Sequence, residues 1–295
     1  MATLRDIKRK IDAVKKTSQI TKAMNMVAAA KLRGAQENME HFQVYASKFR
    51  EVIGRLAGGV EADGEFALMT PREEVRKVEL VLLTADRGLC GSFNNNLIFT
   101  AERFFQQKRD EGVEVSITAA GKKGRDYLRR RRYPVRASYL GLLNKPNYDD
   151  AFQLGRELIA LFEEGECDEI YIIYSHFRSM VKQEATLLRL LPIVPEQAPE
   201  QAEEEELAGR EYIFEPSHQE LLTDLLPNYV YNQLLDCYYL TAVSEHAARM
   251  TAMENATNNC KDLVKDLTLT YNKARQAAIT KELMDIVGGA EALKK

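Results

Sequence analysis

The chain has 295 residues, and its 41 Lys and Arg residues nearly balance its 44 Asp and Glu residues. This length suits one large domain or two modest ones. No apolar run is long enough to cross a membrane, and the first residues lack the apolar core of a signal peptide. We therefore expect no membrane-spanning segment, and we expect no transit peptide because a helical repeat already begins at Leu4.

The four cysteines give no sign of a metal site or a disulfide framework. They form no C-x-x-C pair and no cluster with histidine, and they are Cys90, Cys167, Cys237 and Cys260. Isolated cysteines of this kind are typical of a reducing compartment.

The first 33 residues are strongly basic although the whole chain is not. Nine Lys and Arg residues against two Asp residues give them a local charge of +7. Nucleic acid is one partner for such a segment, and an acidic protein surface is another.

Residues 1–59 carry the heptad repeat of a coiled coil. Steps of three and four residues from Leu4 meet apolar residues at thirteen of sixteen positions, and no proline interrupts the pattern. The segment "GGVEADGE" at 58–65 ends the repeat. A single helix of this length needs a partner. The predicted seam positions are Leu4, Ile7, Ile11, Val14, Ser18, Thr21, Asn25, Ala28, Leu32, Ala35, Met39, Phe42, Ala46, Phe49, Ile53 and Leu56.

Residues 75–215 alternate between strand and helix patterns, which predicts a mostly parallel α/β domain. The segment 195–209 is rich in Pro, Gln and Glu and is expected to be a solvated loop. Two further strands, 184–194 and 210–216, are expected to be antiparallel additions. The other expected strands are 77–86, 113–121, 133–140 and 168–177, and the expected helices are 94–112, 121–132 and 148–165.

Residues 217–295 return to a helical pattern, with Pro227 expected to break an early turn. The stretch from Tyr229 to Val287 contains no proline or glycine. Its predicted apolar stripe is thin and comprises Leu263, Leu267, Tyr271, Ala274 and Ala278. This helix is the natural antiparallel partner of the first one. The predicted fold class is therefore α/β, with a long antiparallel coiled coil of N- and C-terminal helices plus a Rossmann-like α/β head domain.

The segment "TADRGLCGSFNNNL" at 84–97 stands between a strand and a helix, where a phosphate loop would lie. It has only Gly88-x-x-Gly91, without a G-x-G-x-x-G motif or a Walker lysine. We therefore predict a tight turn in which Ser92 or Asn94 caps the helix. Cys90 is expected to be a core or turn residue, since nothing marks His41, His176, His218 or His246 as its base.

The segment "ITKAMNMVAAAKL" at 20–32 is apolar on two faces of its helix. With Leu4 in the seam, Ile20, Met26, Val27 and Ala30 fall at outer positions. A slipped register would turn Ile20, Met24 and Val27 inward, but Ala28 and Leu32 would then face outward, so two faces are apolar in either register. An apolar stripe left in water favours aggregation, so this surface is expected to lie inside another protein. The basic run 129–132, with Lys122, Lys123 and Arg125, is expected to be a solvated face or one that meets an acidic partner; nucleic-acid binding is the alternative.

These segments resemble the gamma subunit of the F-type ATP synthase, in its bacterial form. The resemblance spans nearly the whole chain. The matching segments are "ITKAMNMVAAAKL", "DRGLCGSFN", "ARMTAMENATNN" and "LTLTYNKARQAAITKELMDIVGGAEAL". The resemblance implies a central rotor shaft that couples ion-driven rotation of a c-subunit ring to conformational changes at the catalytic beta subunits. It implies that this chain is not itself an enzyme, with no catalytic, cofactor or metal residues of its own.

The same resemblance implies partners and contact residues. The partners are the alpha and beta subunits of the hexamer, the epsilon subunit and the c ring. The family's contacts with a loop of the beta subunit fall on Arg275, Gln276 and Thr280, and Met24 and Arg249 match positions near the moving face of the hexamer. A bacterial plasma membrane complex is implied, with this chain peripheral on the cytoplasmic side. The regulatory cysteine pair of the chloroplast version has no counterpart here.

Two other functions remain open from the residues alone. One is a nucleotide-dependent α/β enzyme dimerised by a coiled coil, which would require a phosphate loop. The other is a coiled-coil protein that binds nucleic acid through the basic N-terminal segment.

Overall fold

The computed structural model describes residues 3–58, 66–194 and 218–292. By packing, the chain divides into two compact units. Unit 1 comprises Met1–Ala29 and Arg249–Lys295, and unit 2 comprises Ala30–Ala248. Both long helices contribute to both units. The division by sequence into 1–59, 75–215 and 217–295 remains a prediction about domain organisation.

Helix α1 (Leu4–Gly58) begins with a capping box. Thr3 donates its backbone N–H and its hydroxyl to the carboxylate of Asp6, and the Asp6 N–H returns a hydrogen bond to Thr3 Oγ1. These hydrogen bonds, the side-chain one first, lower the pKa of Asp6. The carboxylate therefore stays charged at the positive end of the helix dipole.

The heptad seam predicted for α1 is confirmed by burial. Ile7, Ile11, Ala28, Leu32 and Ile53 are buried, and every other predicted seam position is buried or half-buried. A strict repeat of four and three residues keeps one stripe turned toward a partner along the whole helix.

Helix α5 (His218–Ala292) runs without interruption through Pro227, so the expected break is wrong. Proline in a helix interior costs about 3 kcal/mol because it removes a hydrogen bond and crowds the preceding turn. Leu222, Leu226, Val230 and Leu234 flank it at helical spacing and are all at least 98% buried. Burial of this stripe in the core of unit 2 offsets the local penalty.

The stripe predicted for the second half of α5 is wrong at Leu263, which is 51% exposed. Val264 is half-buried in its place, while Leu267, Tyr271 and the two later alanines are half-buried as predicted. The observed stripe continues from Thr257, which faces α1. Spacing from that contact selects 264 rather than 263.

Unit 2 contains a five-stranded sheet in the order β3-β2-β1-β4-β5. The first four strands are parallel neighbours, and β5 is antiparallel to β4. This order matches one half of a doubly wound sheet, which confirms the Rossmann-like α/β prediction. The predicted strand 210–216 and loop 195–209 lie outside the described residues. The strands are β1 (Lys77–Leu83), β2 (Glu114–Ala120), β3 (Val135–Tyr139), β4 (Glu169–Phe177) and β5 (Gln183–Leu191).

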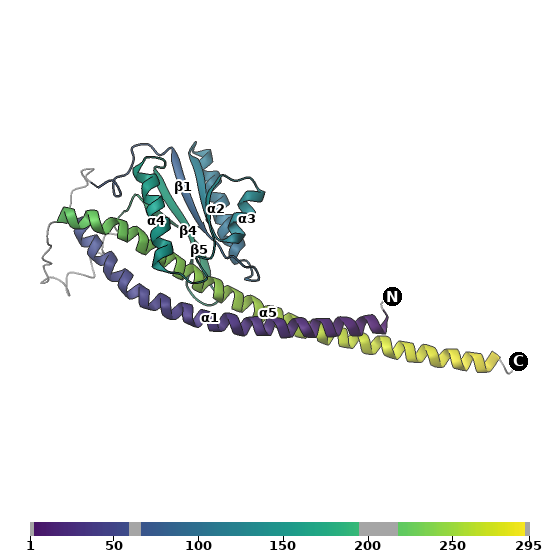
Figure 1. Ribbon diagram of the computed structural model, residues 1–295. Coiled ribbons are helices and arrows are strands. Elements are labelled where there is room, and N and C mark those ends of the chain that lie inside the picture. The colour runs from purple at the N-terminus through teal and green to yellow at the C-terminus, as the bar shows by residue number, and fades with distance from the viewer. Residues whose placement is uncertain (1–2, 59–65, 195–217, 293–295) are drawn as a thin grey trace. The chain divides into compact units, whose positions relative to one another are not determined.

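Helices cover both faces of this sheet (Figure 1). On one face, helices α2 (Phe93–Asp110) and α3 (Lys122–Arg130) pack on the even-numbered residues of β1, such as Leu80 and Leu82. On the other face, α4 (Tyr148–Glu163) and the parts of α1 and α5 in unit 2 pack on Val81 and Leu83. Successive side chains of β1 point to opposite faces of the sheet, so this strand contributes to two hydrophobic cores.

Two helical glycines give a matched test of this packing. A Cβ on Gly155 of α4 would lie 2.3 Å from Tyr231 Cδ1, whereas a Cβ on Gly34 of α1 would meet nothing within 4 Å. We expect Gly155→Ala to lower the free energy of unfolding by about 1–3 kcal/mol through overpacking. Gly34→Ala is expected to raise it by about 0.5–1 kcal/mol, because alanine is the better helix former. Urea unfolding of the purified chain measures both, and equal effects would contradict the packing argument.

Candidate functional site

Unit 1 is an antiparallel pair of helix segments held by polar contacts as well as by its apolar stripe. The hydroxyls of Thr21 and Thr257 lie 2.8 Å apart, and Asn25 Nδ2 donates to the carbonyl of Met250 at 2.8 Å. Polar residues at seam positions fix the register of a coiled coil because a slipped pairing would leave them without partners. The predicted pairing of the two terminal helices is therefore confirmed.

The N-terminal segment of this pair has an exposed apolar surface. Ile20, Met26 and Val27 are 60%, 65% and 59% exposed, although they lie within an unbroken helix. Met24 is half-buried beside the seam. The prediction that these positions face outward from the pair is confirmed, and a second apolar surface needs an occupant from outside the unit.

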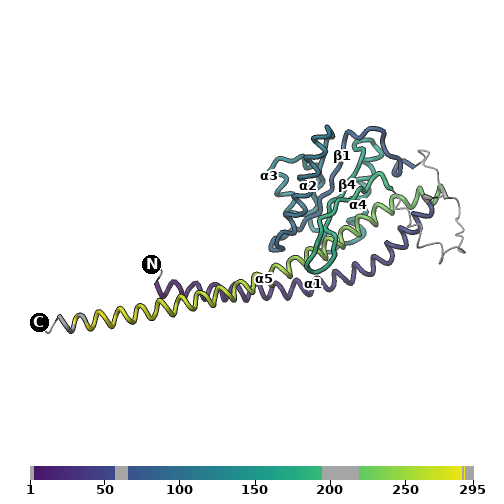
Figure 2. The backbone as a smooth tube through the Cα atoms, turned by 180° about the vertical axis from the view of Figure 1, so that it is seen from behind, coloured from purple at the N-terminus to yellow at the C-terminus, as the bar shows by residue number. Residues whose placement is uncertain are grey.

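The last part of α5 extends beyond its partner helix (Figures 1 and 2). Because Thr21 lies opposite Thr257 in an antiparallel pair, Leu4 at the start of α1 lies opposite about residue 274. The residues that follow on α5 therefore lack α1 alongside them. Five large apolar side chains there are each at least half exposed, namely Ile279, Leu283, Met284, Ile286 and Val287.

Three of the predicted contact residues lie on this unpaired end. Arg275, Gln276 and Thr280 are exposed, and Thr280 Oγ1 donates to the Gln276 carbonyl at 2.9 Å. This bond turns the hydroxyl back on its own helix, while the Arg275 and Gln276 side chains reach solvent. Arg249 is half-buried at the other end of the α5 segment.

All five predicted contact residues, including Met24, belong to unit 1. The five residues come from two distant parts of the sequence, so their positions in the sequence alone did not show that they belong to one unit. The exposed apolar residues after 278 were not predicted, because they fall outside the single stripe at coiled-coil spacing. Apolar residues outside that stripe are the signal in the sequence that could have revealed this surface.

The turn after β1 is built as a closed hydrogen-bonding network rather than an open phosphate loop. Asp86 accepts hydrogen bonds from the backbone N–H of Lys122 at 2.8 Å and of Gly141 at 2.9 Å, and from Asn144 Nδ2 at 3.3 Å. These groups lie at the carboxyl end of the parallel strands, where doubly wound folds hold anionic ligands. A protein carboxylate already occupies their donors.

The helix cap in this turn differs from the one predicted. Ser92 is the residue at the N-cap of α2 but makes no side-chain capping bond. Asn94 lies one residue into the helix, where it accepts from the Ala85 N–H at 2.9 Å and donates to Cys90 Sγ at 3.1 Å. Asn94 therefore ties the turn to the strand instead of capping the helix. Cys90 is 2% exposed, so the prediction of a turn or core cysteine is confirmed.

Helix α3 and the two residues that follow it present a basic surface. The four arginines at 129–132 are exposed, as are Lys122 and Lys123. Arg125 pairs with Asp126 at 2.8 Å, and the Arg131 guanidinium lies 5.1 Å from the Tyr127 ring centroid. None of the described helices in either unit is long and apolar enough to cross a membrane.

The chain is similar to known proteins of one family. A family model described as ATP synthase matches residues 3–293, so the helices and the sheet together correspond to a subunit of that enzyme complex. The ATP synthase gamma chain of Syntrophobacter fumaroxidans is 72% identical over 295 residues and covers 100% of both chains. That of Desulfosudis oleivorans is 50% identical over 300 residues, again covering 100% of both.

The chain therefore belongs to the ATP synthase gamma chain family, whose members are non-catalytic subunits of the complex. Solved structures agree in fold. A rotor chain of the Euglena gracilis mitochondrial ATP synthase aligns with a TM-score of 0.65 at 24% identity, covering 94% of this chain and 98% of that one. A chain of the Tetrahymena thermophila central stalk and c ring aligns with a TM-score of 0.59 at 22% identity, covering 80% and 99%.

Proposed function

We propose that the chain is the central rotor shaft of an F-type ATP synthase. In this role unit 1 turns inside the hexamer of alpha and beta subunits, and the α/β part of the chain contacts the epsilon subunit and the ring of c subunits. Rotation of the ring by ion flow turns the shaft, which drives conformational changes at the catalytic beta subunits. The family assignment supports this role, since the closely similar relatives are gamma chains.

The observation that carries the proposal is the surface of unit 1. A helix segment without a partner along its length is marginal in water, and this one also exposes apolar side chains from Ile279 to Val287. The N-terminal segment exposes Ile20, Met26 and Val27 on a separate surface. Apolar residues on several sides of a narrow helical pair fit a shaft that is surrounded by the alpha and beta subunits.

The proposed contacts with the hexamer are Met24, Arg249, Arg275, Gln276 and Thr280. The exposure of Arg275 and Gln276 supports their assignment, because their donors are directed outward from the helix. A contact that forms at only some rotary angles changes the relative energies of the rotary states, which is how a shaft can transmit force.

The complex to which this chain is assigned is membrane-bound, and we propose the bacterial plasma membrane, with this chain peripheral on the cytoplasmic side. The bacterial source of the similar gamma chains supports this location. The described helices give no membrane span, so attachment would come from the ring of c subunits.

Co-purification tests the proposed role directly. A tagged version of this chain, expressed in its own cells and isolated under mild conditions, should bring down alpha and beta subunits in the ratio of an assembled complex. Truncation after residue 274 removes the unpaired end of α5 and should weaken that association. Recovery of nucleic acid in place of the subunits would favour the basic segment as a nucleic-acid site and refute the proposal.

The purified chain is expected to have no ATPase activity and to bind MgATP poorly. The reason is the carboxylate of Asp86, which takes the backbone donors that a phosphate would need and would repel its charge. Calorimetric titration of the chain with MgATP measures this. Tight one-to-one binding would revive the alternative of a nucleotide-dependent α/β enzyme.

A further inference from the structure

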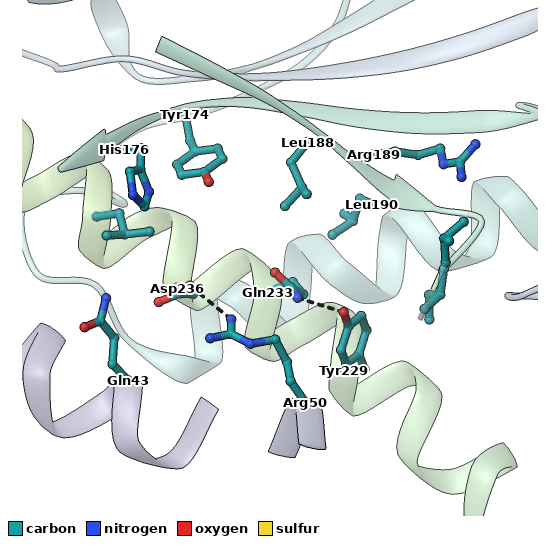
Figure 3. A pocket seen from close by; sticks show the side chains of 13 residues that line it. Gln43, Arg50, Tyr174, His176, Leu188, Arg189, Leu190, Tyr229, Gln233 and Asp236 are labelled. Atoms are coloured by element: carbon teal, nitrogen blue, oxygen red, sulfur yellow. Dashed lines mark hydrogen bonds and ion pairs between the residues drawn. The ribbon is translucent and has the colours of Figure 1, made fainter. Parts of the chain in front are cut away.

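The arginines of unit 2 differ in whether a nearby carboxylate balances their charge. A cavity of about 330 Å³ lies between α1, the β4–β5 hairpin and the first part of α5, and two arginines are part of its lining (Figure 3). Arg50 lies 3.6 Å from Asp236, and Arg189 lies 3.6 Å from Glu169. Both of these charges are therefore balanced within unit 2.

The four consecutive arginines at 129–132, here called the arginine run, have no such balance. All four are exposed, and within the described ranges of the chain none of their side chains forms an ion pair or a hydrogen bond. Asp126, the acidic residue that precedes them on α3, pairs with Arg125 at 2.8 Å. The run therefore presents four positive charges without a counter-charge from its own unit.

The arginine run lies at a corner of the α/β part of the chain. It begins in the last turn of α3 and ends just before β3, which is an edge strand of the sheet (Figure 1). Helix α3 packs on the sheet through Gly124 and Leu128, which are buried. The helix is thus amphipathic, with its cations on the side that faces away from the sheet.

The last residue of the run has a backbone conformation that is unusual for arginine. Helices α2, α3 and α4 all end with the same pair of backbone hydrogen bonds, which requires a positive φ at the residue after the C-cap. After α2 and α4 this residue is a glycine, Gly112 with φ 79° and Gly165 with φ 72°. After α3 it is Arg132, with φ 60°.

Arg132 therefore occupies a position where glycine would be more stable. Glycine adopts a positive φ without a steric penalty, whereas the Cβ of any other residue makes it costly. A helix C-terminus attracts cations, but only within its last turn, where Arg129 and Arg130 already lie. The arginine after that turn thus extends the positive surface at a cost in stability, which indicates a role in binding.

The surroundings of the run favour one kind of anionic partner. From residue 100 to residue 139, a range described throughout, no large apolar side chain is exposed, so the apolar core of a specific protein interface is missing. The two nearby aromatic rings are covered, Tyr127 by Arg131 at 5.1 Å and Tyr133 by Phe105 at 5.0 Å, so neither is free to stack on a nucleic-acid base. Guanidinium groups suit phosphate oxygens, and clusters of roughly four to eight basic residues on an amphipathic helix bind anionic lipids.

We propose that the arginine run is a docking surface for the phosphate groups of an anionic lipid membrane. Its use in the cell rests on the proposed function, because the α/β part of a rotor shaft beside the c ring is close to lipid headgroups. The binding itself is a property of this chain and needs no other subunit. At about 0.1 M salt the Debye length is about 10 Å, so a membrane surface interacts with the run while the net charge of −3 of the whole chain is largely screened.

Sedimentation of the purified full chain with lipid vesicles tests the proposal. Vesicles of equal parts phosphatidylcholine and phosphatidylglycerol should bind the chain at about 0.1 M salt and release it at about 1 M, where the Debye length is about 3 Å. Vesicles of phosphatidylcholine alone should not bind it. Equal binding to both kinds of vesicle, or no binding to the anionic ones, would overturn the proposal. Tighter binding of a DNA duplex than of the anionic vesicles would also overturn it and assign the run to nucleic acid.

A pair of double variants separates the run from the charge of the whole chain. Arg129→Gln combined with Arg130→Gln should lower the partition onto anionic vesicles roughly thirtyfold, because each basic residue at an anionic surface contributes roughly fivefold. The control is Arg33→Gln combined with Arg156→Gln, two exposed positions elsewhere in unit 2 that remove the same charge. The control should bind like the unmodified chain, and an equal loss in both variants would refute a localised surface.

The single variant Arg132→Gly distinguishes binding from a structural role. It should raise the urea midpoint of unfolding, because glycine relieves the cost of the positive φ, and at the same time lower the partition onto anionic vesicles roughly fivefold. A purely structural arginine predicts the opposite, namely a lower midpoint with unchanged partition, and that result would exclude Arg132 from the docking surface. These outcomes are independent of co-purification with alpha and beta subunits, so the lipid proposal and the rotor proposal can fail separately.

Discussion

Replacing Arg275 and Gln276 together with leucine is expected to leave the ATP synthase assembled but to reduce its steady-state ATP hydrolysis and synthesis several-fold. Both side chains are exposed on the part of α5 that extends beyond α1. Arginine is a planar donor suited to carboxylates, and glutamine both donates and accepts. Leucine keeps the helix and removes these hydrogen bonds.

The expected size of this effect follows from the proposal that the contact forms at only some rotary angles. A hydrogen bond to a charged group contributes about 1.5–3 kcal/mol, and a loss of about 1 kcal/mol of that energy at one rotary barrier slows passage over the barrier roughly fivefold. Assembly depends on the much larger total surface of the shaft, so it should survive. Turnover per assembled complex, with subunit content checked on a gel, measures the prediction.

A matched double variant controls for the added apolar surface. Gln106 and Arg109 are exposed on α2 in unit 2, and their joint replacement with leucine makes the same chemical change away from the proposed contact. That variant should turn over normally. Normal turnover in the Arg275 and Gln276 variant as well would show that these side chains are merely solvated, and their assignment as partner contacts would fall.

The architecture of this chain could be predicted because its signals are long and repetitive. The heptad seam of α1 continues over many turns, and the alternation of buried strands with helices defines the parallel sheet. The errors came where packing overrides a local rule. Proline in a helix interior normally ends or kinks the helix, but burial of Leu222, Leu226 and Leu234 keeps α5 helical through Pro227. Leu263 is apolar and was therefore expected at the seam. The register of the helix pair is fixed by the contact between Thr21 and Thr257, and one heptad beyond Thr257 is residue 264 rather than 263.

The candidate site, too, was only partly predictable from the sequence. The outward direction of Ile20, Met26 and Val27 followed from the heptad register, whereas the exposed residues after 278 required knowing where α1 ends opposite α5.

Met24→Lys is expected to impair coupling while the complex still assembles. Met24 is half-buried in unit 1, between the seam and the exposed apolar surface. A lysine there must either lose its hydration or find a carboxylate on the surrounding subunits. Neither solution is equally good at every rotary angle, so some positions of the shaft become more stable than others. Proton pumping per ATP hydrolysed in membrane vesicles should therefore fall.

Two comparisons separate charge from position in this test. Met24→Leu conserves volume and apolar character, so it should change stability by less than about 1.5 kcal/mol and leave coupling intact. Lys22 is exposed on the same helix and already carries an ammonium group, which indicates that charge itself is tolerated nearby when it reaches solvent. The effect at Met24 must then come from enclosure of that position. An unchanged ratio of protons pumped to ATP hydrolysed in Met24→Lys vesicles would mean that no partner encloses it, and this part of the shaft would face solvent throughout the rotary cycle.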